Sequence, residues 1–261
     1  LIADAQRHGV EVRRPCVQSS TVGASLEWAD DRAVVRLGLR GLRGLSDELA
    51  EAVVHGAPWA DLESLVRTVG LRPHHTEALA MAGALDVFSP SRRDTLWRAG
   101  ALAYASADRL PGVVTGTTPP PLPEVTDLER VADDMWSMGL TPDATVMEYL
   151  RDELDARGVT RADALFGAEA RRVLVAGVVT HRQHPETARG AVFLNLEDET
   201  GHVNVIFSKG AWLRWESVAR HAPLLLIRGT LERGQGTVAV AAEFVEELHV
   251  AVATPPSRDF R

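Results

Sequence analysis

The chain has 261 residues, a formal net charge of −8 and a single cysteine. This length allows one large domain or about two to three small ones, and 45% hydrophobic residues can form sizeable cores. One cysteine excludes an intramolecular disulfide, and the lack of an apolar run of ~20 residues excludes a membrane-spanning helix. The acidic balance argues against a dedicated duplex-binding protein, which is usually basic.

The first residues have the pattern of a helix already under way. LIADAQRHGV lacks an initiator Met, and a helix is predicted from Ile2 to His8, so we expect a piece of a longer protein. A loop is predicted up to residue 33, and a short apolar strand from Ala33 to Leu39. No secretory signal pattern is present, which favours a cytoplasmic location.

Residues 34–107 are predicted to form a helical domain. A glycine turn from Gly41 to Ser46 leads into a helix that ends at Val54, with Ser46 as its N-cap. The side chains expected on the buried side of this helix are Leu49, Ala52 and Val53. Further helices are predicted near Asp61–Val69, near Pro73–Ala82 and over Ser91–Ala105, the last with Leu96, Ala99 and Leu102 facing inward.

The glycine turn is a candidate phosphate site. A turn before a helix N-terminus offers backbone N–H groups and the positive end of the helix dipole, which suits an anion. Arg40 and Arg43 add positive charge beside Gly44. An ordinary packing turn between two helices explains the same residues equally well, so both interpretations stay open.

Residues 108–170 are predicted to be a linker followed by acidic helices. Leu110 to Pro123, LPGVVTGTTPPPLP, cannot hold a helix, and its proline run favours an extended conformation. Residues 111–170 contain twelve acidic side chains and four arginines, which is typical of a solvent-exposed connector. Helices are predicted over Asp127–Ser137, Thr145–Arg157 and Arg161–Leu165, with stops at Gly139 and Gly158.

From residue 171 the pattern changes to β-strands. The predicted elements are strands over Arg172–His181, 191–207 (a hairpin), Ala222–Glu232 and Thr237–Glu247, a polar loop over Arg182–Gly190, and a helix over Lys209–Arg220 anchored by Trp212 and Val218. Five strands with one helix between the third and fourth give the order of an OB barrel. We assign 171–250 to this barrel and 251–261 to a disordered tail, so the chain is predicted to be an α+β multidomain protein.

The hairpin 191–207 carries its chemistry on the outer face. Period-two alternation puts apolar residues on one face and Phe193, Asn195, His202 and Asn204 on the other. An aromatic ring beside amide and imidazole groups suits the stacking and hydrogen bonding of nucleic-acid bases. Three arginines in the predicted barrel loops complete this candidate site: Arg182, Arg189 and Arg233. The alternative is that Phe193 packs under a neighbouring domain.

No catalytic centre is predicted. The acidic clusters Asp30–Asp31, Asp133–Asp134 and Glu197–Glu199 fall in turns or on a polar helix face, where neighbouring carboxylates diverge into water. One cysteine beside scattered histidines, such as His181 and His184, does not make a zinc site. No nucleophile, Walker or dinucleotide motif is present. We therefore predict no catalytic residue, no metal ligand and no cofactor in this chain.

Five stretches carry a family resemblance: LIADAQRHGVEVRRP, AVVRLGLRGLRGL, TEALAMAGALD, RRDTLW and VFLNLEDETGHVNVIF. In this order they resemble the C-terminal region of bacterial C-family DNA polymerases, the DNA polymerase III alpha-subunit family, in its error-prone branch. The resemblance implies that residues 1–33 end the fingers, that 34–107 form a helix-hairpin-helix domain approaching duplex DNA, and that the OB barrel lies near the single-stranded template. It also implies a parent nucleotidyltransferase that uses Mg²⁺ and dNTPs, with its catalytic carboxylates outside this chain.

The chain departs from the family pattern at two places. Ser46 stands where the family usually has a second glycine, which weakens the phosphate interpretation because serine tolerates a positive φ poorly. Pro15–Gln18, PCVQ, stands in place of Pro-Asp-Val-Asn. The barrel also resembles the anticodon-binding barrel of class II aminoacyl-tRNA synthetases, in which the positions matching Phe193 and Asn204 stack and read a base.

The predicted function is DNA binding and partner docking within an error-prone polymerase active in translesion synthesis and DNA repair in the bacterial cytoplasm. The barrel would contact single-stranded template, and the helix-hairpin-helix region would contact duplex DNA through Arg43 and Gly44. The alternative is a protein-interaction module that recruits accessory mutagenesis or replication subunits and binds little DNA itself, which the acidic connector favours. Neither hypothesis involves a membrane.

Overall fold

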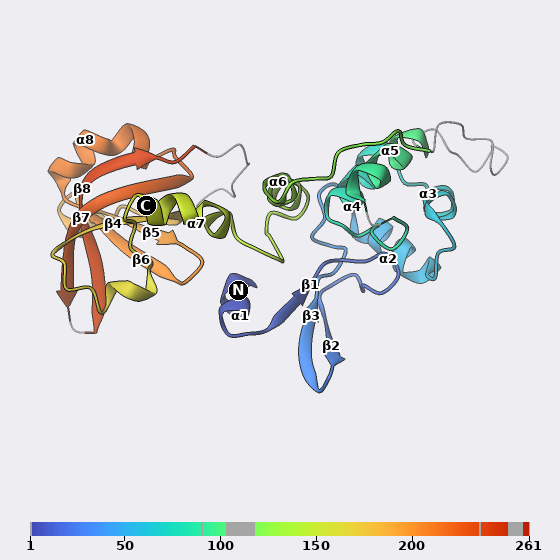
Figure 1. Cartoon of the computed structure of the whole chain (residues 1–261), viewed down its shortest axis with the longest axis horizontal. Helices are drawn as coiled ribbons and strands as arrows, with labels where there is room; N and C mark the ends of the chain where they lie inside the picture. Colours follow the sequence, from blue (N-terminus) through green and yellow to red (C-terminus); the bar gives the residue numbers. More distant parts are fainter. Residues whose placement is uncertain (1, 90, 103–117, 235, 250–257, 261) are drawn as a thin grey trace. The chain divides into compact units, whose positions relative to one another are not determined.

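The computed structural model describes residues 2–89, 91–102, 118–234, 236–249 and 258–260. The chain divides into two compact units, Leu1–Asp143 and Ala144–Arg261 (Figure 1). Each unit has its own hydrophobic core. The expected α+β class, with a helical region followed by a β-barrel, is confirmed. None of the helices in these described ranges is long and apolar enough to cross a bilayer.

The first unit opens with a short helix and a small sheet. α1 (Ile2–Arg7) precedes β1 (Glu11–Arg13), β2 (Ser25–Ala29) and β3 (Arg32–Arg36), and the sheet order is β1-β3-β2. The predicted loop up to residue 33 is therefore wrong in part, and the strand expected to reach Leu39 ends at Arg36. Asp30 and Asp31 form the β2–β3 turn with φ of 48° and 60°, a conformation that Asp tolerates better than most residues.

Four helices build the core of the first unit: α2 (Asp47–Gly56), α3 (Leu62–Val69), α4 (Pro73–Met81) and α5 (Arg92–Leu102). Ser46 caps α2 as predicted, because its side chain accepts the N–H of Leu49 at 3.3 Å. Ala50 and Val53 are fully buried, whereas Ala52 is exposed. The expected buried set is wrong at Ala52 because Ala50, three residues before Val53, shares its face of the helix. The last three residues of the helix predicted over Ser91–Ala105, those after Leu102, lie outside the described residues.

The acidic helices are divided between the two units. α6 (Asp127–Met138) belongs to the first unit and α7 (Val146–Ala156) to the second. Both begin with a Thr-x-x-Glu capping box, in which side chain and backbone bond reciprocally. The helix expected over Arg161–Leu165 is a single 3₁₀ turn, η1 (Asp163–Leu165). Residues 110–117 of the predicted linker lie outside the described ranges, and 118–123 have no regular secondary structure.

The second unit contains a closed five-stranded barrel. Its strands are β4 (Arg172–Gln183), β5 (Val192–Glu197), β6 (His202–Phe207), β7 (Leu224–Gly234) and β8 (Thr237–Glu247). They pair in the order β5-β6-β8-β7-β4, and a further β4–β5 pairing closes the barrel. A short 3₁₀ turn, η2 (Glu186–Ala188), lies between β4 and β5, and α8 (Lys209–Ala219) connects β6 to β7 (Figure 1). Trp212 anchors α8 in the core as predicted.

A sixth strand corrects the expected tail. β9 (Arg258–Phe260) pairs in parallel with His181–Gln183 of β4, so residues 258–260 are not unstructured. This edge of β4 is available to β9 because β7 pairs only with residues 172–178 of β4. The rest of the predicted tail, 251–257 and 261, lies outside the described residues.

Candidate nucleic-acid interface

The outer faces of β4, β5 and β6 form an open pocket of about 410 Å³. Along β5 and β6 burial alternates, so that the apolar residues face the core, Phe193 and Asn195 are half-buried, and His202 and Asn204 are exposed. The structure thus brings the four predicted hairpin residues together. The pocket is lined by His181, Gln183, Phe193, Leu194, Asn195, His202 and Asn204.

Hydrogen bonds connect the polar side chains of this pocket. Asn195 lies directly opposite Asn204 in the β5–β6 ladder, and its Nδ2 donates to Asn204 Oδ1 at 3.1 Å. Thr180 Oγ1 donates to Asn195 Oδ1 at 2.9 Å, and His181 Nδ1 lies 3.0 Å from Thr180 Oγ1. These hydrogen bonds link the two amides in the pocket that the Phe193 ring also lines.

His181 and Gln183 line the pocket, although neither was predicted as a contact residue. The predicted strand ended at His181, whereas β4 continues to Gln183 after a register shift between Val179 and His181. Such a bulge changes the direction of the side chains that follow it. Beyond the bulge, period-two alternation places His181 and Gln183 on the outer face. The sequence signal for these two contacts is the polar triplet His181-Arg182-Gln183, through which the strand alternation can be continued.

The predicted loop position of Arg182 is wrong. Arg182 lies on β4 rather than in a loop and is 8% exposed. Its guanidinium donates to the carbonyl of Ala219 at 2.9 Å and to that of Ala222 at 2.6 Å. These carbonyls end α8 and the turn after it, so Arg182 satisfies acceptors at a helix C-terminus. Arg182 is thus engaged within the fold, and nucleic-acid contact by this residue stays a prediction.

Arg189 and Arg233 lie outside the pocket. Arg189 is exposed in the β4–β5 connection, with φ of 52°. Arg233 is exposed near the end of β7 rather than in the predicted loop, and its Nη2 donates to the carbonyl of Ala168. Nucleic-acid contact by these two arginines stays a prediction.

The glycine turn before α2 packs against α6. Gly44 carries the positive φ, 74°, while Ser46 is extended with φ of −75°, so the serine departure causes no backbone strain. The N–H of Arg43 donates to the carbonyl of Ser137 at 2.8 Å, and its guanidinium lies 4.7 Å from the centre of the Trp136 ring. Arg43 is thus engaged within the protein, which favours the packing-turn interpretation.

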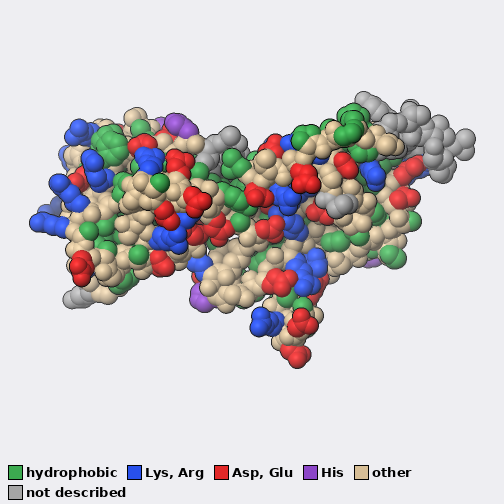
Figure 2. Space-filling view, viewed as in Figure 1, with side chains coloured by type: hydrophobic (Ala, Val, Ile, Leu, Met, Phe, Trp, Pro, Cys, Tyr) green, Lys and Arg blue, Asp and Glu red, His purple; other side chains and the backbone are tan. Residues whose placement is uncertain are grey.

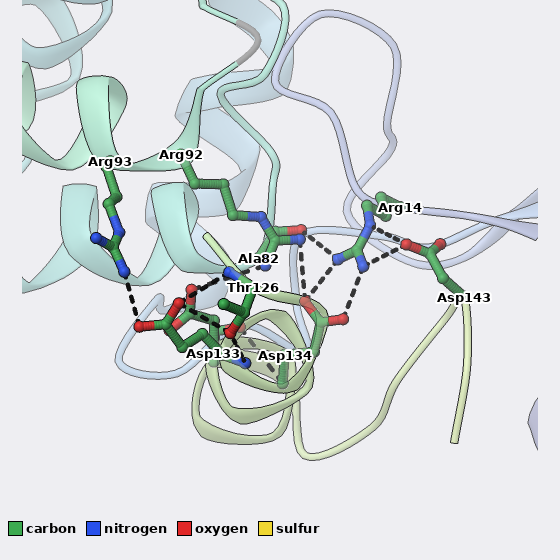
Figure 3. Close-up of polar contacts among 10 residues, drawn as sticks. Arg14, Ala82, Arg92, Arg93, Thr126, Asp133, Asp134 and Asp143 are labelled. Atoms are coloured by element: carbon green, nitrogen blue, oxygen red, sulfur yellow. Dashed lines mark hydrogen bonds and ion pairs between the residues drawn. The ribbon is translucent and has the colours of Figure 1, made fainter. Parts of the chain in front are cut away.

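A buried ion cluster holds α6 on the first unit. The Asp134 carboxylate accepts hydrogen bonds from Arg14 at 2.6 and 2.7 Å and lies 3.1 Å from Arg92. Figure 3 shows both guanidinium groups directed at Asp134. Burial acts to lower the pKa of Arg14, but hydrogen bonds to Asp134 and Asp143 raise that pKa above its usual value. The carboxylates of Asp133 and Asp134 on α6 are therefore ion-pair partners of arginine side chains.

Asp133→Asn is expected to increase the stability of the first unit slightly at neutral pH. Burial raises the pKa of Asp133, and the attraction of Arg92, 3.9 Å away, offsets this only in part. An ionised carboxylate whose folded pKa is raised opposes folding, and this penalty disappears as the pH falls below its pKa in the unfolded chain. Urea denaturation should show a gain of up to about 1 kcal/mol at pH 7 and none near pH ~3. A loss of stability at pH 7 would contradict this.

The other acidic clusters are also structural. Asp30 and Asp31 form an exposed turn. The buried Asp198 carboxylate accepts the N–H groups of Thr200, Gly201 and Ala162 at 2.8, 2.9 and 2.8 Å. In the part of the chain that the structure describes, no group of three or more His, Cys, Asp or Glu could hold a metal ion. These clusters do not fit the Mg²⁺ that the family resemblance implies for the whole polymerase.

One family match falls within each of the two units. A helix-hairpin-helix motif family matches residues 9–95, and an OB-fold nucleic acid binding domain family matches residues 173–248. Together with the closed barrel they define the class: a chain with helix-hairpin-helix and OB-fold nucleic-acid-binding domains. Over its full length, the chain is 47% identical across 266 residues to the error-prone DNA polymerase of Mycobacterium bovis, and 44% identical across 275 residues to that of Nocardia farcinica.

The chain is homologous to the C-terminal region of error-prone DNA polymerases. The predicted resemblance is thereby confirmed. The chain spans 24% of the length of each of these two relatives.

Proposed function

We propose that this chain binds DNA within an error-prone polymerase that acts in translesion synthesis and DNA repair, with its barrel contacting the single-stranded template. The observation that carries this proposal is the pocket across β4, β5 and β6, where the Phe193 ring stands beside Asn195, His202 and Asn204. An aromatic ring stacks on any base, and amide groups hydrogen-bond base edges. The helix-hairpin-helix unit contacts duplex DNA in the same assembly.

The surface charge limits the affinity of this contact. The chain has a net charge of −8, and on the face shown in Figure 2 acidic side chains accompany basic ones over much of the surface. Because phosphate neutralisation supplies much of the affinity of nucleic-acid binding, we expect the chain alone to bind weakly. The little electrostatic attraction that it has should fall further with added salt.

Phe193→Ala is expected to weaken the binding of oligo-dT by roughly 5- to 150-fold, since stacking contributes about 1–3 kcal/mol per base. Fluorescence anisotropy with a labelled oligomer at low salt measures the dissociation constant. Phe166→Ala is the matched control, because Phe166 is 65% exposed in the same unit and does not line the pocket. Equal affinities of the wild type and Phe193→Ala would overturn the proposal.

The activity of the whole protein is also part of the proposal. The names of the relatives, which are error-prone DNA polymerases, support DNA synthesis by the whole protein. Mg²⁺ and dNTPs as its cofactor and substrates, and a location in the bacterial cytoplasm, are part of this proposal through the family resemblance. The acidic clusters of the described residues do not fit that metal, so we assign this chain no catalytic step.

Docking of an accessory replication or mutagenesis protein is a second candidate function, favoured by one observation. Leu26 and Trp28 are 68% and 74% exposed on one face of β2. A large aromatic side chain on an exposed apolar surface is typical of a protein contact. This function takes precedence if the chain binds a purified accessory subunit and no DNA oligomer.

A further inference from the structure

The turn between β5 and β6 is held by residues 145–165 of the same unit, which contain α7 and η1. The buried Asp198 carboxylate accepts the N–H of Ala162 at 2.8 Å. Thr200 Oγ1 accepts the N–H of Asp163 at 3.1 Å. These partners precede the turn by 36 and 37 positions. The turn is therefore fixed to a part of the chain outside the hairpin.

Arg151 on α7 makes the charged part of this contact. Its Nη2 donates to Glu199 Oε2 at 2.7 Å, and its Nε lies 2.6 Å from Oε1 of the same carboxylate. The side chains of Arg151 and Glu199 are 9% and 11% exposed, and Asp198 Oδ2 lies 3.8 Å from Arg151 Nη2. A guanidinium that faces both oxygens of a carboxylate restricts the orientation of the pair as well as its distance. Arg151 thus sets how the turn lies against α7.

α7 is itself anchored on other strands of the barrel. Leu154 of α7 is buried. Arg157 Nη2 donates to Glu246 Oε1 of β8 at 2.8 Å. Just after the helix, the N–H of Thr160 donates to the carbonyl of Leu174 in β4 at 2.7 Å. α7 consequently connects the β5–β6 turn with β4 and β8.

The end of the hairpin next to this turn belongs to the candidate pocket. His202 is the first residue of β6 and lines the pocket together with Asn204. β6 pairs with β8 only over Asn204–Ile206, so among the described strands β5 is the ladder partner of β6 at His202. Because a two-stranded hairpin is only marginally stable by itself, this end of the pocket depends on the contact with α7.

We infer that Arg151 is a positioning residue for the nucleic-acid contact of the barrel, and that α7 controls the affinity of the pocket by holding the β5–β6 hairpin in its binding conformation. This inference rests on the proposed single-strand binding. Arg151 does not line the pocket, so it acts through the hairpin and not on the ligand. A site that is ordered before binding loses less conformational freedom on binding and therefore binds more tightly.

Arg151→Met is expected to raise the dissociation constant of oligo-dT by about three- to tenfold, measured by fluorescence anisotropy with the whole chain where the variant is folded. Amide hydrogen exchange should become faster over residues 192–207 and stay at the wild-type rate over β7, because the hairpin alone loses its support. A purely stabilising role of Arg151 would instead speed exchange in all the strands together and leave the affinity of the folded protein unchanged.

Arg157→Met is the matched control, because it removes the same charge from the same helix but breaks a contact with β8. The side chains of Arg157 and Glu246 are 34% and 42% exposed, and an exposed ion pair contributes little. The dissociation constant and the hairpin exchange of this variant should stay within about twofold of the wild type.

If Arg151→Met does not fold, Glu199→Gln decides, since it keeps the size of the side chain, removes one charge of the pair and should raise the oligo-dT constant by about two- to threefold. Wild-type affinity in the folded variant, or faster exchange spread over all the strands, overturns this inference and leaves the proposed function standing. Failure of the wild type to bind oligo-dT overturns the proposed function and this inference together.

Discussion

Asp134→Ala is expected to lower the free energy of unfolding of the first unit by about 3–5 kcal/mol. The Asp134 side chain is 2% exposed and pairs with Arg14 and Arg92, whose own side chains are 18% and 6% exposed. Removing the carboxylate leaves the buried guanidinium of Arg92 and the part-buried one of Arg14 without the counter-charge that they share, and desolvation then opposes folding. Because Arg14 and Asp134 lie 120 positions apart in the chain, the loss should detach α6 from the rest of its unit.

Amide hydrogen exchange along residues 127–138, together with urea denaturation, measures this effect. Asp143→Ala is the matched control: Asp143 also bonds Arg14, but its side chain is 55% exposed. A surface ion pair contributes about 0–1 kcal/mol, so that variant should remain close to the wild type. If Asp134→Ala also unfolds like the wild type, the buried cluster does not hold α6.

Arg182→Ala is expected to destabilise the barrel by about 3 kcal/mol, since hydrogen bonds to a charged donor contribute about 1.5–3 kcal/mol each. The carbonyls of Ala219 and Ala222 would lose their donor in a buried site. Oligo-dT affinity, measured well below the unfolding transition, should stay near the wild-type value. If Arg182 acted only in binding, Arg182→Ala would instead weaken oligo-dT binding and leave the stability of the barrel unchanged.

Urea denaturation followed by far-ultraviolet circular dichroism reports this loss, with Arg189→Ala as the control. Arg189 is exposed in the β4–β5 connection, where substitutions usually change stability by less than about 0.5 kcal/mol. An Arg182→Ala protein as stable as the control, with weakened oligomer binding, would restore Arg182 to the candidate site.

Local features of the chain could be predicted from sequence because neighbouring residues determine them. Ser46 caps α2, Gly139 ends α6 in the left-handed region, and the period-two pattern defines β5 and β6. Caps and alternation depend on the backbone within a few residues. The prediction was wrong for β2 and its Asp30–Asp31 turn, because this strand depends on pairing with β3.

The order of the barrel strands, their inner and outer faces and the family resemblance could be predicted from the sequence, because residue periodicity and motif order are properties of the chain itself. Which polar residues share a site depends on the fold. The bulge between Val179 and His181 sets whether Arg182 faces the core and Gln183 the pocket, and β4–β5 pairing brings Thr180 to Asn195. Strand register and buried charge pairing depend on contacts between distant segments, which no local pattern encodes.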